Sequence, residues 1–142
     1  MSYRDQLIEY IRKKYKSSPE TLWMRYPDYV TFRHADNQKW FALIMNITRD
    51  KLGLPGREAV DILNVKAADL LLADLLVQQD GYFRGYHISR GNWISILLDG
   101  SVPLPDVVRW VDESYLATAS KAERLKHRPP KEIGRASCRE RV

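Results

Sequence analysis

The clearest alternation of apolar and polar positions lies in the second half of the chain. Ile94, Ile96 and Leu98 recur at every second position, so they share one face of a predicted strand. Trp93 therefore points to the opposite face. A polar, glycine-bounded loop precedes this strand. Apolar residues at helical spacing predict a helix after it, with Ser101 ahead of the helix, Pro105 near its first turn and an end at about Tyr115.

Two more apolar segments, residues 29–34 and 39–48, flank a polar turn and predict a β-hairpin. Alternation divides the second strand into two faces, one with Phe41, Leu43, Met45 and Ile47 and the other with Trp40, Ala42, Ile44 and Asn46. Both sets are largely apolar. We therefore expect this strand to be central in its sheet and largely covered.

The remaining apolar positions predict two helices and a third strand. Ser2 is a suitable N-cap for a first helix, whose apolar positions are Leu7, Ile8, Ile11 and Tyr15. Alternation over residues 61–66 predicts the strand. Residues 67–77 form a leucine-rich helix, and its broad apolar surface predicts deep packing. Tyr82 and Phe83 have the character of a short extra strand.

The predicted order of elements is helix, three strands, helix, strand and helix, with room for a fourth short strand before Trp93. Because a hairpin starts the sheet, we expect an antiparallel sheet with helices packed on one face, which is an α+β fold. A length of 142 residues fits a single domain, and we place it at residues 1–120.

If helices cover one face of the sheet, strand parity predicts which side chains lie on the other, open face. They are Tyr29, Thr31, Arg33, Trp40, Asn46, Asn64, Lys66, Trp93 and Ser95. Two tryptophans near arginine, lysine and asparagine side chains could stack on a ligand and hydrogen-bond to it. The alternative is that loops and the C-terminal tail cover the tryptophans.

Two polar loops beside the strands are candidate contacts for phosphates or base edges. The loop before Trp93 carries His87, Arg90 and Asn92, although a polar turn in which a carbonyl satisfies His87 explains these residues equally well. The charged residues beside the hairpin turn are Arg33, His34 and Lys39. Charge at a hairpin tip usually serves solubility alone, which is the simpler interpretation.

The excess of positive charge lies outside the predicted domain. The formal net charge is +5, yet residues 1–120 hold 15 Lys and Arg against 15 Asp and Glu. Residues 121–131 carry the basic excess with two prolines and little periodicity, which predicts a disordered basic tail. Composition alone therefore does not supply the clustered positive charge that a phosphate-binding surface needs.

The last residues do not fit a natural protein. Residues 133–142 are what a common sequencing adapter encodes, with Glu132 as the joining codon, so we expect residues 132–142 to be non-native and exclude them from the fold. Cys138, the single cysteine, lies there. We therefore expect no disulfide, reactive thiol or cysteine metal ligand in the natural chain up to that point.

Enzymatic signatures are missing from the sequence. His34, His87 and His127 lack the spacing of metal ligands, and the glycines lack the setting of a phosphate loop. We expect no cofactor, no bound metal and no enzymatic activity. No apolar run approaches the ~20 residues of a membrane span, and the N-terminus lacks a signal-peptide pattern. We therefore expect a cytoplasmic protein with no membrane partner.

Three stretches resemble the MmcQ/YjbR family in pattern and order. They are residues 85–100 with the following helix, the hairpin over residues 31–44, and residues 63–66 running into a helix. The resemblance covers roughly residues 1–118, and it implies a frataxin-like fold and a DNA-binding role for two wing-like elements. We expect a non-enzymatic domain that binds DNA through Arg33, Lys39, Lys66, His87, Arg90, Asn92 and Trp93. The alternative is a protein- or small-ligand-binding module that uses the open sheet face.

Overall fold

The computed structural model describes residues 2–21, 25–86 and 91–126. Its elements in chain order are α1 (Tyr3–Tyr15), β1 (Val30–Arg33), β2 (Trp40–Thr48), the 3₁₀ helix η1 (Arg49–Leu52), β3 (Ala59–Lys66), α2 (Leu70–Leu76), β4 (Tyr82–Arg84), β5 (Trp93–Leu97), α3 (Leu104–Thr118) and α4 (Lys121–Lys126). This order confirms the predicted succession of helices and strands, including the short strand before Trp93. It adds η1 and α4.

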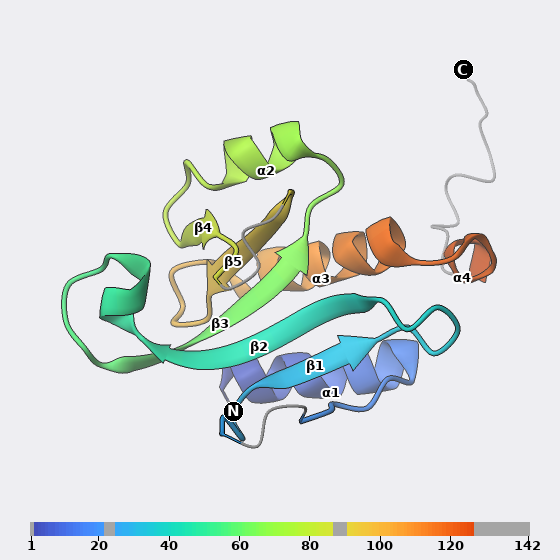
Figure 1. Cartoon of the computed structure of the whole chain (residues 1–142), viewed down its shortest axis with the longest axis horizontal. Coiled ribbons are helices and arrows are strands. Elements are labelled where there is room, and N and C mark those ends of the chain that lie inside the picture. Colours follow the sequence, from blue (N-terminus) through green and yellow to red (C-terminus); the bar gives the residue numbers. More distant parts are fainter. Residues whose placement is uncertain (1, 22–24, 87–90, 127–142) are drawn as a thin grey trace.

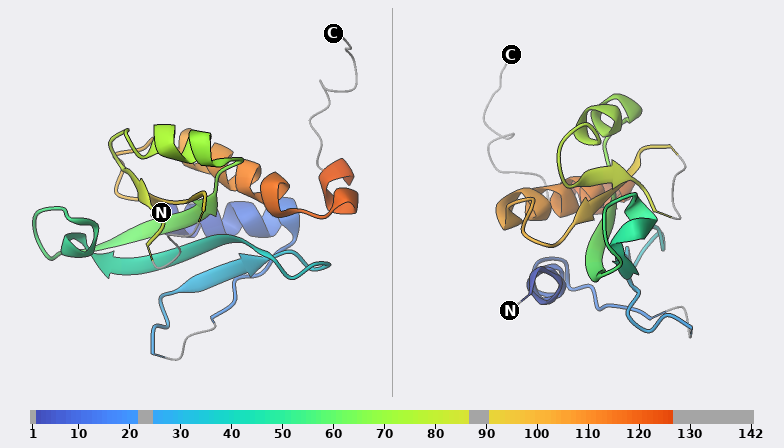
Figure 2. Two further views of the ribbon diagram at one scale, coloured as in Figure 1. Left: turned by 45° about the horizontal axis from the view of Figure 1, so that its top comes forward. Right: turned by 90° about the vertical axis from the view of Figure 1, so that its left-hand side faces the viewer.

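The strands form one sheet in the order β1-β2-β3-β5-β4, and every neighbouring pair is antiparallel. Figure 1 shows α1 and α3 behind this sheet, and the edge-on view in Figure 2 places both helices on the same side of it. The structure thus confirms an α+β fold in which helices cover one face of an antiparallel sheet.

Local signals set the ends of the two long helices. The Ser2 Oγ accepts a hydrogen bond from the Asp5 backbone N–H at 3.1 Å, which confirms the predicted N-cap of α1. α1 ends where Lys16 adopts a left-handed conformation, with φ of 55°. α3 carries Pro105 in its first turn, where no backbone N–H is needed. None of the helices within the described ranges is long and apolar enough to cross a membrane.

The main core lies between the sheet and the two long helices. From the strands it receives Val30, Phe32, Phe41, Ala42, Ile44, Leu63, Val65, Ile94 and Ile96, and from the helices Leu7, Ile11, Val107, Trp110, Val111 and Tyr115. Most of these side chains have no exposed surface. Their burial is the main source of stability for the fold, because transfer of apolar surface out of water drives folding.

The leucine-rich helix α2 corrects one prediction. It was expected to be deeply packed, but Leu70, Leu71 and Leu75 are 56%, 70% and 53% exposed, and only Ala73 and Leu76 are buried. The reason is its position. α2 lies beside β4, the edge strand of the sheet, rather than across the sheet face (Figure 1), so only one side of it meets the core.

The basic tail is not disordered at its start. Lys121–Lys126 form α4, where the sequence predicted an unstructured segment. The Ser120 Oγ accepts a hydrogen bond from the Glu123 N–H at 3.2 Å, and the Arg124 guanidinium donates to the Ala119 carbonyl at 3.0 Å. These contacts join α4 to the end of α3. Residues 127–142 lie outside the described part of the chain.

Candidate functional site

A β-bulge between β1 and β2 decides which way Trp40 points. Phe32 pairs with Ala42 and Arg33 pairs with Trp40, so Phe41 is an extra residue on β2. As a result Phe41 and Ala42 both enter the main core, whereas Trp40 turns to the sheet face opposite α1 and α3. We call this face the second face.

Simple alternation along β2 was therefore wrong in grouping Trp40 with Asn46. The Asn46 amide donates a hydrogen bond to the Asp61 carboxylate at 2.9 Å, and Arg4 of α1 bonds the same carboxylate at 3.4 Å. Asn46 thus lies on the side of the sheet that faces α1, and it is not part of the second face.

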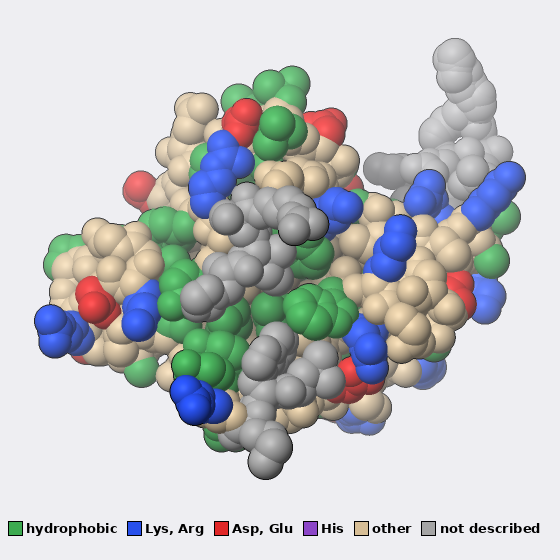
Figure 3. Space-filling view, in the orientation of Figure 1, with side chains coloured by type: hydrophobic (Ala, Val, Ile, Leu, Met, Phe, Trp, Pro, Cys, Tyr) green, Lys and Arg blue, Asp and Glu red, His purple; other side chains and the backbone are tan. Residues whose placement is uncertain are grey.

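The second face carries a second apolar cluster rather than an open polar surface. Its buried members are Leu43, Met45, Ile47, Ile62 and Leu97, and its half-buried members are Tyr29, Trp40, Leu52, Leu54, Val60, Phe83 and Tyr86. Figure 3 views this face and shows hydrophobic side chains across its middle, with Lys and Arg side chains around them. The face is therefore apolar at its centre, and its border carries charged side chains of both signs.

Three polar residues expected on the open face are buried within it. Thr31, Asn64 and Ser95 have 0% exposed surface. The Ser95 hydroxyl donates to the Asn64 side-chain oxygen, and it accepts a hydrogen bond from the Tyr86 N–H at 2.8 Å. These groups hold neighbouring strands and the backbone at Tyr86 in place, so they are not available to a ligand.

Four other predicted residues do come together, and we call them the tryptophan end. One ladder row of the second face contains Thr31, Leu43, Asn64 and Ser95. The adjoining row of the same face contains Arg33, Trp40, Lys66 and Trp93. In this row Arg33 pairs with Trp40, and Lys66 pairs with Trp93. All four are partly exposed. Each indole therefore has a cation as its cross-strand neighbour.

The two cations of the tryptophan end differ in their surroundings. Arg33 forms an ion pair with Glu20 at 2.8 Å, because the segment before β1 pairs with that strand at Glu20 and Thr31. Within the described residues, neither Lys66 nor the exposed Lys39 in the hairpin turn forms an ion pair. Lys66 and Lys39 therefore keep their charge available to an anionic ligand.

The predicted wings are only partly described. His87 and Arg90 lie outside the described residues. The Asn92 amide donates to the Ala67 carbonyl, so it ties the segment before β5 to the segment after β3. His34, which was expected at a wing tip, is only 2% exposed.

The hairpin turn is packed against α3, which explains why His34 is buried. The His34 Nε2 lies 2.8 Å from the Thr118 Oγ, and the Asn37 amide donates to the Thr118 carbonyl at 3.1 Å. A turn held in this way is not a free wing. Lys39 is exposed, like several other residues of this turn, and stays a candidate contact.

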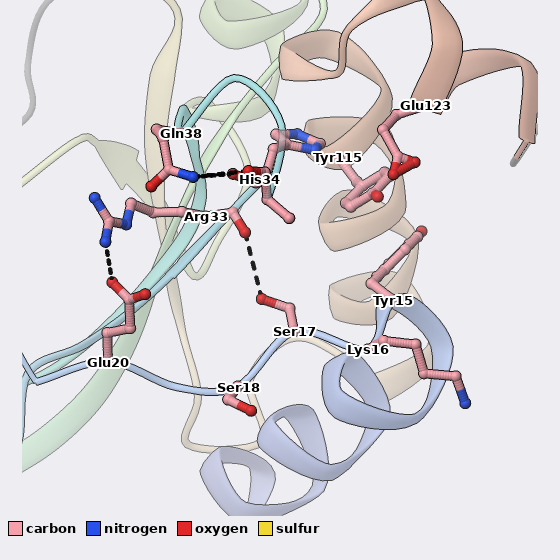
Figure 4. A pocket seen from close by; sticks show the side chains of 11 residues that line it. Tyr15, Lys16, Ser17, Ser18, Glu20, Arg33, His34, Gln38, Tyr115 and Glu123 are labelled. Atoms are coloured by element: carbon pink, nitrogen blue, oxygen red, sulfur yellow. Dashed lines mark hydrogen bonds and ion pairs between the residues drawn. The ribbon is translucent and has the colours of Figure 1, made fainter.

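A separate pocket of about 340 Å³ lies where β1, the end of α1 and the end of α3 meet (Figure 4). Its lining residues are Tyr15, Lys16, Ser17, Ser18, Glu20, Arg33, His34, Ala35, Gln38, Tyr115 and Glu123. Sequence reasoning missed this pocket, because its residues come from segments far apart in the chain. The described residues contain no group of three or more His, Cys, Asp or Glu side chains that could hold a metal ion.

The inner wall of the pocket is aromatic. The rings of Tyr15 and Tyr115 stack with centroids 3.8 Å apart, and the His34 ring lies 4.3 Å from Tyr115. The Tyr15 hydroxyl donates to the Asp112 carboxylate at 2.5 Å. Burial, then the hydrogen bond to this carboxylate, raises the pKa of Tyr15. Burial likewise raises the pKa of Tyr115 to about 12.

The chain belongs to the MmcQ/YjbR family, because the YjbR family model matches residues 12–117. It is 36% identical over 118 residues to the uncharacterized protein YyaQ of Bacillus subtilis, which covers 83% of this chain and 99% of that protein. None of these similarities identifies a ligand.

Solved structures agree with the family assignment. The fold is similar to the crystal structure of a Pseudomonas syringae protein, with a TM-score of 0.78 and 35% identity over 82% of this chain and 98% of that chain. The crystal structure of Deinococcus radiodurans protein DR2400, titled as a DUF419 domain, has a TM-score of 0.65 at 21% identity, covering 89% of this chain and 88% of that chain. The second likeness concerns the fold alone.

Proposed function

We propose that this chain is a non-enzymatic domain that binds DNA through the tryptophan end of its second face. The observation that carries the proposal is the pair of cross-strand neighbours Arg33–Trp40 and Lys66–Trp93 at one end of one face. Bases stack on indole rings without regard to sequence, and adjacent cations attract the phosphates. Lys39, in the turn next to Trp40, adds charge at the same border.

Single-stranded DNA is the form that this surface suits best. Stacking on an indole requires the flat side of an unpaired base, which a duplex does not offer. Each of the two partly exposed tryptophans can stack with one base, while the DNA backbone passes the lysine side chains on the same face of the sheet. We therefore expect a single strand to bind more tightly than the matching duplex.

The test is fluorescence anisotropy with labelled single-stranded and duplex DNA at several salt concentrations. Trp93→Ala is expected to weaken single-strand binding by about 1–3 kcal/mol, the usual contribution of one stacked base. The full chain is compared with a chain shortened after Ser120, which keeps the whole family match. The proposal is wrong if all binding disappears with the tail, or if Trp93→Ala leaves the affinity unchanged.

A second candidate function follows from the apolar centre of the second face. Five buried and seven half-buried apolar residues form its cluster, and a protein partner could cover the exposed part of them. Binding of that kind depends little on salt, whereas binding to phosphates weakens steeply as salt is added. Insensitivity to salt together with loss of binding in Trp93→Ala would favour a protein partner over DNA.

A further inference from the structure

A carboxylate lies beside the tryptophan end, on the same face of the sheet. The backbone of Glu20 pairs with that of Thr31 on the outer edge of β1, through two N–H···O hydrogen bonds of 2.9 Å. Directly opposed residues of an antiparallel pair share a face, so the Glu20 side chain lies on the second face with Thr31 and Arg33. Its carboxylate contacts the terminal nitrogen of Arg33 at 2.8 Å (Figure 4). One cation of the tryptophan end is therefore already occupied by an anion.

The geometry of this ion pair makes it replaceable. Within the described part of the chain, neither the Arg33 Nε nor the Glu20 Oε1 makes a hydrogen bond of good geometry. The pair therefore lacks the two parallel N–H···O bonds of the strongest arginine–carboxylate contacts. The two side chains are 33% and 39% exposed, so water and salt also screen their attraction. A phosphate oxygen on the same guanidinium can compete with a contact of this kind.

The Glu20 side chain has space to leave Arg33. Both side chains line the pocket of about 340 Å³ beside β1, and Glu20 is held to β1 by backbone groups, so its side chain can rotate without breaking the strand pairing. Within the described residues, Lys66 and Lys39 form no ion pair. A strand already held at Lys66 brings its next phosphates to Arg33 at a high effective concentration.

We propose that Glu20 is a built-in competitor of DNA on Arg33, and that a phosphate of the bound strand displaces its carboxylate before both cation–indole pairs engage the strand. This inference rests on the proposed function, because the displacing anion is the DNA backbone. Glu20 thus lowers the affinity in two ways: it occupies the guanidinium, and its charge repels the nearby phosphates. Removal of this single charge is expected to strengthen binding, although it removes a contact from the folded chain.

The test is fluorescence anisotropy of the full chain with labelled single-stranded DNA at several salt concentrations. Glu20→Gln keeps the backbone pairing with β1 and removes the charge. It is expected to bind roughly two- to fivefold more tightly at low salt, the range for an exposed ion pair, and to steepen the salt slope by about one. Glu58→Gln is the matched control. It makes the same change in net charge at an exposed residue at the other end of the sheet, and is expected to alter neither quantity.

A double-mutant cycle identifies Arg33 as the group that is released. Arg33→Gln is expected to weaken binding more in the Glu20→Gln chain than in the wild type, because only there is the guanidinium free before DNA arrives. The inference is overturned if Glu20→Gln leaves affinity and slope unchanged, or weakens binding, which would mean that Glu20 holds Arg33 in place for DNA. The proposed function survives either result if wild-type binding still depends on Trp93. Absence of single-strand binding by the wild type overturns both.

Discussion

Lys66 of β3 and Trp93 of β5 are cross-strand partners, and both lie on the sheet face opposite α1 and α3. Cross-strand neighbours have Cβ atoms about 5 Å apart, so the charge lies within reach of anything stacked on the indole. Arg33 and Trp40 repeat this arrangement on β1 and β2. The proposed function depends on these two pairs acting together.

Replacing Lys66, which forms no ion pair within the described residues, should change the salt dependence of DNA binding. Lys66→Ala is expected to reduce the slope of log affinity against log salt by about one, because one phosphate contact and its counterion release are lost. Lys51→Ala is the control, since Lys51 is equally charged but lies in η1 at the other end of the second face. Equal slopes for the wild type and Lys66→Ala would place the phosphate contacts elsewhere.

The buried polar pair on the second face should be important for stability. Ser95→Ala removes the donor to Asn64 and the acceptor for the Tyr86 N–H. Leaving such groups without a partner costs about 1–3 kcal/mol in the free energy of unfolding, which urea denaturation can measure. If Ser95→Ala costs less than about 0.5 kcal/mol, as an ordinary surface change does, this network does not hold the strands as described.

The stacked tyrosines predict a loss of stability at alkaline pH. Burial raises the pKa of both Tyr15 and Tyr115 from the ordinary value of 10.0, and that of Tyr115 reaches about 12. The unfolded chain has ordinary tyrosine pKa values, so it loses these protons first as the pH rises. The contribution to stability is therefore complete below about pH 10 and is lost as the pH rises through the folded-state pKa values.

Circular dichroism and tyrosinate absorbance, recorded together during an alkaline titration, measure this effect. Unfolding is expected to accompany ionisation of the two residues, and Tyr15→Phe should make the pH dependence of stability less steep. Titration of every tyrosine near pH 10 with the circular dichroism unchanged would contradict the prediction.

Two leucines of α2 should differ strongly in their effect on stability. Leu71 is 70% exposed, so Leu71→Lys is expected to change the free energy of unfolding by no more than about 0.5 kcal/mol. Leu76 is 4% exposed and belongs to the main core, so Leu76→Ala is expected to cost about 2–5 kcal/mol. Chemical denaturation of both variants measures the two changes in the free energy of unfolding. A large cost for Leu71→Lys would mean that α2 packs more deeply than described.

The fold could be predicted where local alternation matches the final sheet. Ile94 and Ile96 share the core face because β5 is regular, and Ser2 caps α1 because the cap involves only neighbouring residues. Alternation placed Trp40 on the correct face but Asn46 on the wrong one, because a bulge lies between them, and a bulge is a relation between two strands that has no signature in one of them. The burial of α2 was overestimated for a similar reason, since a leucine-rich pattern does not show whether a helix lies over a sheet or beside its edge.

The candidate site could be predicted only in part, because its geometry also depends on contacts between segments that are far apart in the sequence. Parity along single strands was enough to place Lys66 and Trp93 on one face. It did not show that Asn64 and Ser95 are sealed within that face, because their burial depends on Tyr86 and the neighbouring strands. The pocket around His34 depends on contacts with α3 that are 84 residues distant in sequence, as in the His34–Thr118 contact.

The most direct measurement follows the indole N–H signals of the tryptophans during an NMR titration with single-stranded DNA. The account predicts that the Trp40 and Trp93 signals shift together as the complex forms. Trp110 is 8% exposed in the main core and donates to the Tyr82 hydroxyl, so its signal should stay in place as an internal control. Shifts confined to the backbone amides of Lys121–Lys126, with Trp40 and Trp93 unmoved, would contradict the account.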